Sequence, residues 1–180
     1  MARRRESPEP PADPGPRSRA GASPMRRAIA VHLPGHWPEE AAVETVTLAF
    51  LDRHRRRIRL VSDTGGAFLL DLPRAARLAD GDGLELAGGG YIRVRAAAEP
   101  VLEIATAEPA TLLRIAWHLG NRHLPVQIVG DRLCIREDPV IGEMVVGLGG
   151  HIERREAPFD PEIGAYEHAH SREVEDHGSG

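Results

Sequence analysis

The first half of the chain alternates short apolar runs with turns rich in glycine. Six of these runs are four to six residues long and rich in β-branched or aromatic residues: AIAVHL (28–33), VTLAF (46–50), IRLV (58–61), AFLLDL (67–72), GLELA (83–87) and YIRVRA (91–96). Gly-Gly, Asp-Gly-Asp-Gly and Gly-Gly-Gly sequences separate several of them, as expected for turns between strands. The pattern predicts a small antiparallel β-domain, a sandwich or a curled sheet, over residues 25–97.

After residue 97 the period of the apolar positions changes. VLEIAT (101–106) predicts a strand, and Leu112, Leu113, Ala116 and Leu119 then form a helical stripe. This helix opens at Glu108-Pro109, where proline is tolerated because the first turn has no partner for its N–H. It should end at Gly120-Asn121, which we expect to supply the left-handed residues of the helix end.

The remaining pattern completes a recognised order of elements. VQIV (126–129) and RLCI (132–135) flank a Gly-Asp turn and predict a hairpin. Asp138-Pro139 should cap a second helix that stops at Gly149-Gly150, and HIERRE (151–156) should be a last strand. The order βαββαβ predicts a ferredoxin-like domain over residues 98–158 and therefore an α+β protein of two domains.

Both ends of the chain differ in composition from the middle. Residues 1–24 are rich in Pro, Arg and Ser and should form a disordered extension, and the charge through Arg27 is 7 Arg minus 3 acids, or +4. From His151 onward 8 acids face 3 Arg, or −5, and we expect residues 159–180 to be a flexible tail containing acids and histidines. A basic cluster, Arg53–Arg57, is interpreted as a solvated strand end or turn, or as a patch for a partner.

The overall composition narrows the function. The net charge of −4, with 4% aromatic residues, gives no general reason to expect nucleic-acid binding. The single Cys134 excludes an internal disulfide and a cysteine-based zinc cluster, and its apolar neighbours suggest a buried position. No apolar run approaches the length of a membrane span, so we expect a cytoplasmic protein without membrane contact.

Histidines are the remaining candidates for chemistry, because no phosphate loop, nucleophile elbow or H-E-x-x-H motif is present. His123 follows the first helix in a loop closed by Pro125, a position where ligands are often displayed. Metal binding and a plain loop residue remain equally open for His123 from spacing alone, and His118 is more typical of a surface or capped histidine.

The tail contains a second group of imidazoles. His168 and His170 form an H-x-H pair that can approach one ion from the same side of an extended segment, and His177 follows further on. Imidazoles and carboxylates suit zinc, nickel and copper. A solvated, pH-sensitive tail is the alternative interpretation.

Several stretches together resemble the UreE family of urease accessory proteins, which are nickel metallochaperones. They are VTLAFLDRHRRRIRLVSDTGGAFLLDLP (46–73), GDGLEL (81–86), VRAAAEPVLEI (94–104), LLRIAWHLGNRHLPVQI (112–128), DPVIGEMVVGLG (138–149) and APFDPEIGAYEHAH (157–170). The resemblance implies a β-domain that binds partners and a C-terminal metal-binding domain. It also implies a homodimer without catalytic activity, in which His123 of both subunits shares one Ni²⁺ at the two-fold axis.

The resemblance assigns further roles. His168 and His170 would complete the coordination, with His177 a weaker ligand and His118 an accessory ligand or a supporting group. Zn²⁺ and Cu²⁺ are alternative ions in vitro, since imidazole sites do not by themselves favour nickel over copper. The implied partners are the UreG GTPase and, through it, the UreD–UreF–urease complex. Some relatives carry an additional H-x-H before the second helix, where this chain has Glu137-Asp138-Pro139, so we expect no additional site there.

Two other classes of function fit parts of the sequence. An RNA-binding module could use the ferredoxin-like half and the basic cluster, but the acidic balance and the lack of aromatic residues in 126–135 oppose it. A metal-dependent hydrolase lacks an evident general base beside three fixed ligands.

Overall fold

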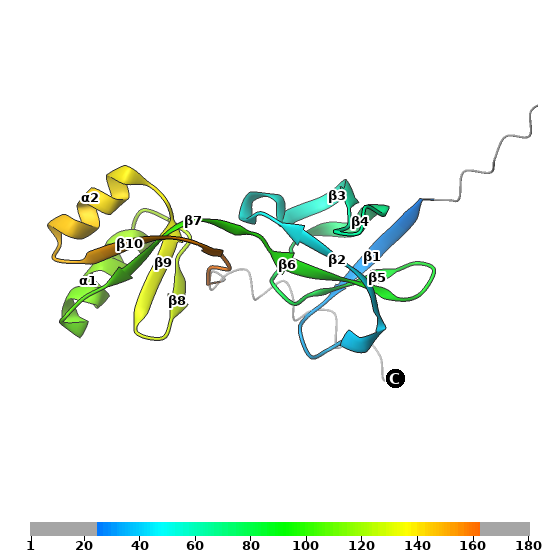
Figure 1. The fold of residues 1–180 in the computed structure, drawn as a ribbon, viewed down its shortest axis with the longest axis horizontal. Helices are drawn as coiled ribbons and strands as arrows, with labels where there is room; N and C mark the ends of the chain where they lie inside the picture. The colour runs from blue at the N-terminus through cyan, green and yellow to red at the C-terminus, as the bar shows by residue number, and fades with distance from the viewer. Residues whose placement is uncertain (1–24, 163–180) are drawn as a thin grey trace, which may run out of the picture.

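The computed structural model describes residues 25–162, which form two β-sheets placed side by side (Figure 1). The first sheet has six strands in the order β2-β6-β5-β1-β4-β3. Its strands are β1 Arg26–His32, β2 Ala42–Leu48, β3 His54–Val61, β4 Ala67–Arg77, β5 Gly83–Leu86 and β6 Tyr91–Ala96, with the short 3-10 turns η1 Glu39–Ala41 and η2 Phe50–Asp52. All six predicted strands are confirmed.

The pairing within this sheet is mixed and not wholly antiparallel as expected. β1 pairs with β4 and β2 with β6 in parallel, while the other three pairings are antiparallel. Glycine turns indicate where the chain reverses, but a parallel pair joins strands that are distant in sequence and leaves no local turn pattern. The alternation of buried Phe68, Leu70 and Leu72 along β4 places one face of the sheet on the core.

The second sheet has four strands in the order β10-β7-β9-β8, and every neighbouring pair is antiparallel. Its elements are β7 Ala98–Ala105, α1 Pro109–Gly120, β8 Gln127–Val129, β9 Arg132–Arg136, α2 Pro139–Gly147 and β10 His151–Pro158. Ile115 and Leu119 of α1 and Val145 of α2 pack with the sheet residues Leu102 and Ile104 in one core. The predicted βαββαβ order of the ferredoxin-like fold is therefore confirmed.

Local features of the second half also follow the sequence. The Asp138 carboxylate accepts hydrogen bonds from Val140 N at 2.9 Å and Ile141 N at 3.0 Å, as an N-cap should. Cys134 is buried, and burial raises the pKa of its thiol. Within residues 25–162 neither helix is long and apolar enough to cross a membrane.

A buried arginine joins the two sheets. Arg53, which is 1% exposed, donates to the Asp160 carboxylate at 2.8 Å and to the backbone oxygens of Leu78 and Phe159. Arg77 donates to the same Asp160 oxygen at 2.8 Å. We call these three side chains the Arg53–Asp160–Arg77 clamp. The interpretation of the basic cluster as solvated is therefore wrong for Arg53, although Arg56 and Arg57 are exposed.

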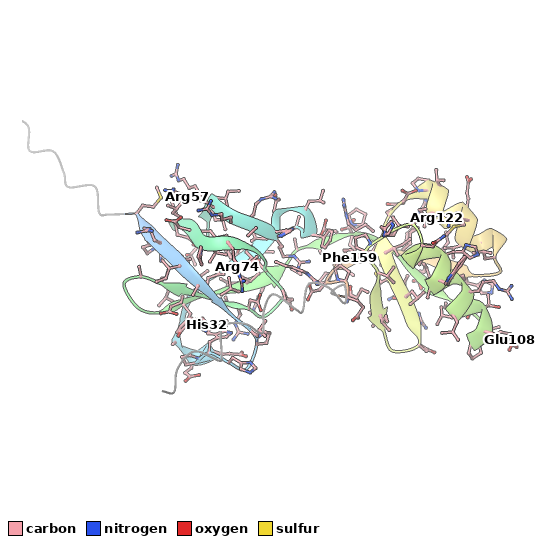
Figure 2. All side chains as sticks on the ribbon, turned by 180° about the vertical axis from the view of Figure 1, so that it is seen from behind. His32, Arg57, Arg74, Glu108, Arg122 and Phe159 are labelled. Carbon is pink, nitrogen blue, oxygen red and sulfur yellow. The ribbon has the colours of Figure 1, made fainter. Side chains whose placement is uncertain are left out.

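Aromatic packing supports the clamp. Phe159 is fully buried, and its ring meets that of Phe50 edge-on at 5.2 Å between centroids. Figure 2 shows Phe159 at the junction between the two sheets. Because Arg53 and Phe50 belong to the first half of the chain and Phe159 and Asp160 follow the last strand, the end of the second domain is fixed on the first.

Asp82 lies close to this junction, and its burial should make the stability of the protein depend on pH. It is 1% exposed, its Oδ2 accepts from Ala79 N at 2.7 Å, and its Oδ1 has no partner among the described residues. Burial raises the pKa of Asp82 from 3.8 to about 6, although the Ala79 N–H opposes the rise. Folding therefore favours the protonated form, and this contribution to stability is present below pH 4 and lost as the pH rises through 6.

We expect Asp82→Asn to stabilise the protein relative to wild type at pH 8 but not at pH 4. The difference between the two pH values should be up to about 3 kcal/mol in the free energy of unfolding. Urea unfolding at both values measures it. Asp71→Asn is the control. The hydrogen bond from Arg27 lowers the pKa of Asp71, so this substitution should decrease the free energy of unfolding at pH 8. A constant difference between wild type and Asp82→Asn across this range would contradict the assignment.

Candidate metal site

His123 occupies a fixed position in the turn that ends α1. His123 N donates to Gly120 O at 2.9 Å, and Leu124 N donates back across the turn to Leu119 O at 3.2 Å. These two bonds form a Schellman motif in which His123 holds the left-handed position, with φ of 56°. Among residues 25–162 it is the one non-glycine residue with positive φ.

The expected place of the left-handed residue is therefore wrong. Gly120 belongs to α1, and Asn121 keeps a helical φ of −64° because its N–H still donates to Trp117 O. The chain reverses two residues later than the Gly-Asn pair suggests. The left-handed conformation, which costs most residues about 1–2 kcal/mol, is thus adopted by a histidine.

The end of α2 shows the usual solution to the same geometry. Gly149 N donates to Val146 O at 3.0 Å and Gly150 N to Val145 O at 2.9 Å, and Gly149 has φ of 92°. One helix thus places glycine at the left-handed position and the other places His123 there. A strained residue that a glycine could replace suggests that its side chain is needed.

The His123 side chain is exposed, and among the described residues its ring has no hydrogen-bond partner. His118 lies one turn earlier on α1, is half-buried and meets the Trp117 ring edge-on at 4.9 Å between centroids. Its backbone oxygen accepts from Arg122 at 3.2 Å, which ties the helix end to the turn. In Figure 2, Arg122 lies at the other end of α1 from Glu108.

Residues 25–162 of a single chain contain no group of three or more His, Cys, Asp or Glu side chains that could hold a metal ion. The predicted ligands His168, His170 and His177 lie outside the described residues. The structure therefore places His118 and His123 in neighbouring turns but does not test the predicted ligand set. Some relatives carry an additional H-x-H before the second helix. At this place the chain has Asp138, which caps α2.

A groove of about 910 Å³ opens beside His123, between the two sheets. The first sheet and its turns contribute Leu51, His54 and Arg55, and the second contributes Pro125 and Ile128 beside His123. The other residues that line it are Phe50, Arg53, Arg77, Ala116, Gly120, Leu124, Val126, Leu133, Pro161 and Glu162. The groove is a structural feature that the sequence did not reveal, because its walls come from four segments that are distant in the sequence, around residues 50–55, 77, 116–133 and 161–162.

Two family models together match almost all of the described chain. The model of the UreE urease accessory protein N-terminal domain matches residues 26–97, and that of the C-terminal domain matches residues 99–180. The chain belongs to the UreE family of urease accessory proteins. The resemblance inferred from the GNRH segment and the residues around it is confirmed.

Curated relatives agree with this assignment. A urease accessory protein UreE of Rhodopseudomonas palustris strain HaA2 is 56% identical over 146 residues, which cover 81% of this chain and 67% of the relative. One from Bradyrhizobium sp. strain BTAi1 is 51% identical over 154 residues, covering 85% and 74%. A third, from Chelativorans sp. strain BNC1, is 48% identical over 141 residues, covering 78% and 89%.

The strain at His123 generates a prediction that separates fold from function. His123→Gly should raise the free energy of unfolding by about 1 kcal/mol, because glycine adopts the left-handed conformation without steric cost. Asn121→Gly in the same turn is the matched control and should lower it by about 0.3 kcal/mol, because residue 121 has a helical conformation that glycine favours slightly less than asparagine. Thermal or urea unfolding measures both. Equal destabilisation by the two variants would show that position 123 is not strained.

Proposed function

We propose that this chain is a nickel metallochaperone that takes part in urease maturation. It would bind Ni²⁺ as cargo, in the cytoplasm, between the His123 side chains of two subunits and release it by ligand exchange. The protein would therefore act by binding and transfer and not as an enzyme. Membership of a family of urease accessory proteins supports the maturation role.

The observation that carries the proposal is the geometry of His123. The His123 imidazole is exposed and has no hydrogen-bond partner within residues 25–162, and two backbone hydrogen bonds hold this residue in a conformation that glycine would adopt more easily. A metal ligand benefits from such a fixed backbone, because little entropy is lost when the ion binds. One imidazole is a weak site, but a two-fold axis brings the same residue twice.

The outer surface of α1 supports a contact between subunits. Leu113 is 73% exposed and Trp117 is 63% exposed, and their i, i+4 spacing places them on one side of the helix. Large apolar side chains gathered on a surface mark contact sites. Because Trp117 lies in the last turn of α1, close in sequence to His123, we propose that a two-fold contact through Leu113 and Trp117 brings the two imidazoles together.

Three of the other proposed ligands lie on the tail, and His118 lies on α1. His168 and His170 would complete the coordination, and His177 and His118 would contribute less. We propose the first sheet as the partner-binding domain and the second as the metal-binding domain. UreG, and through it the UreD–UreF–urease complex, would receive the ion.

No observation on the described residues favours either alternative. β8 and β9 contain no aromatic residue on which RNA bases could stack. A hydrolase would need three fixed ligands and a base, and residues 25–162 of one chain contain no such group.

Nickel titration by calorimetry tests the proposal, with the mass of the protein measured in parallel. We expect the wild type to bind one tight Ni²⁺ per dimer. His123→Ala, which removes two ligands from each dimer, should lower the affinity by more than about 100-fold without changing the mass. His36→Ala is the control, since His36 is an exposed histidine before η1 and far from α1 in sequence.

A second variant separates the contribution of the tail to nickel binding from that of His123. Deletion of residues 167–180 should weaken nickel binding less than His123→Ala and leave the dimer intact. Zn²⁺ and Cu²⁺ titrated alongside report the metal preference. Full nickel affinity in His123→Ala would contradict the role of His123.

A further inference from the structure

The described chain ends at the edge of the groove between the two sheets. Pro161 and Glu162, its last two residues, both line this groove together with His123. The 18 residues that follow begin with Ile163-Gly164-Ala165-Tyr166. The groove and the start of the tail are therefore neighbours by covalent connection.

The point at which the tail leaves is held by hydrogen bonds to both domains. Asp160 is bound by Arg53 and Arg77 of the clamp, each at 2.8 Å, and Asp160 N donates to the Gln127 side chain at 3.0 Å. Glu162 N donates to Val126 O at 2.8 Å. Glu162 is thus fixed relative to the loop that carries His123, since its partner Val126 lies three residues after His123 in the same loop.

The groove and the start of the tail match in apolar character. Leu51, Pro125 and Ile128 give the groove an apolar wall, and residues 163–166 include Ile, Ala and Tyr. Ile128 and Leu51 are 58% and 60% exposed, so an apolar occupant would cover them.

We propose that this groove is the docking site of the chain's own segment 163–170, with Tyr166 as its apolar anchor. Tyr166 is four residues beyond the fixed Glu162 and can reach at most about 14 Å from it. A tether this short gives an effective concentration in the millimolar range, which favours the chain's own tail over a second copy or another protein. The docked segment would bring His168 and His170 to His123.

The approach of His168 and His170 to His123 matters only if the proposed nickel function holds, but the docking of the segment does not depend on that function. The tail would be positioned before the ion arrives, so that its imidazoles approach His123 from the side of the groove. The clamp would then have a role beyond joining the domains, because it sets where the tail begins. Docking without metal is therefore the outcome to test.

Disulfide formation in the full-length chain measures the docking directly. Ile128→Cys combined with Ala165→Cys should form a disulfide within one chain in metal-free buffer containing a chelator and oxidised glutathione. Val61→Cys with Ala165→Cys is the matched control, because Val61 is 57% exposed but does not line the groove. We expect the groove pair to react at least about tenfold faster than the control pair.

Two further variants identify the anchor. Tyr166→Ala added to the groove pair should reduce its rate toward that of the control, and Tyr166→Phe should preserve it. Equal rates for the two cysteine pairs would overturn the proposal, as would disulfides that link two chains, which would make the tail of a second copy the occupant. Because no metal is present, failure here leaves the nickel titration of His123→Ala unaffected, and failure of that titration leaves this docking unaffected.

Discussion

The reversal of the chain after α1 depends on one left-handed residue, His123, and the proposed metal site is built on it. Two backbone hydrogen bonds, from His123 to Gly120 and from Leu124 to Leu119, close the turn, and they require a left-handed residue at position 123. The side chain that projects from this position is therefore set by the backbone and not by its own contacts. The comparable turn after α2 uses glycine and projects nothing. The proposed role as a metal ligand gives a reason for histidine at position 123 despite this conformational cost.

The Arg53–Asp160–Arg77 clamp gives the turn its surroundings. A buried ion pair of this kind contributes little net stability, because the charges lose their hydration, but it specifies one arrangement of its partners. Arg53 and Arg77 come from the first domain, and Asp160 follows the last strand of the second. The clamp thereby fixes the groove beside His123 and the exit of the tail at its edge. Both are consequences of the relative placement of the two sheets in Figure 1.

The sequence predicted the elements more successfully than their connections. Apolar alternation in β4 and the helical stripe of α1 are local patterns, and both elements lie where those patterns indicate. The parallel pairing of β1 with β4 is not local, since about 40 residues separate Arg26 from Phe68. Arg53 was interpreted as part of a solvated basic cluster, because no nearby residue in the sequence indicates its partner. That partner, Asp160, lies 107 residues away. The GNRH resemblance singled out His123 as a predicted ligand, but not its left-handed conformation. That conformation depends on the hydrogen bonds that end α1, and these lie beyond the Gly-Asn pair that was expected to end it.

The central claim is that nickel is shared by His123 of two chains. Mixed dimers of wild-type and His123→Ala chains, separated by a mass tag and loaded with nickel, test this claim most directly by native mass spectrometry. We expect wild-type dimers to carry one tightly bound Ni²⁺. Mixed dimers, which keep a single His123, should lose the ion at free nickel concentrations that saturate the wild type. Mixed dimers that retain nickel as tightly as wild-type dimers would contradict a site shared between the two subunits.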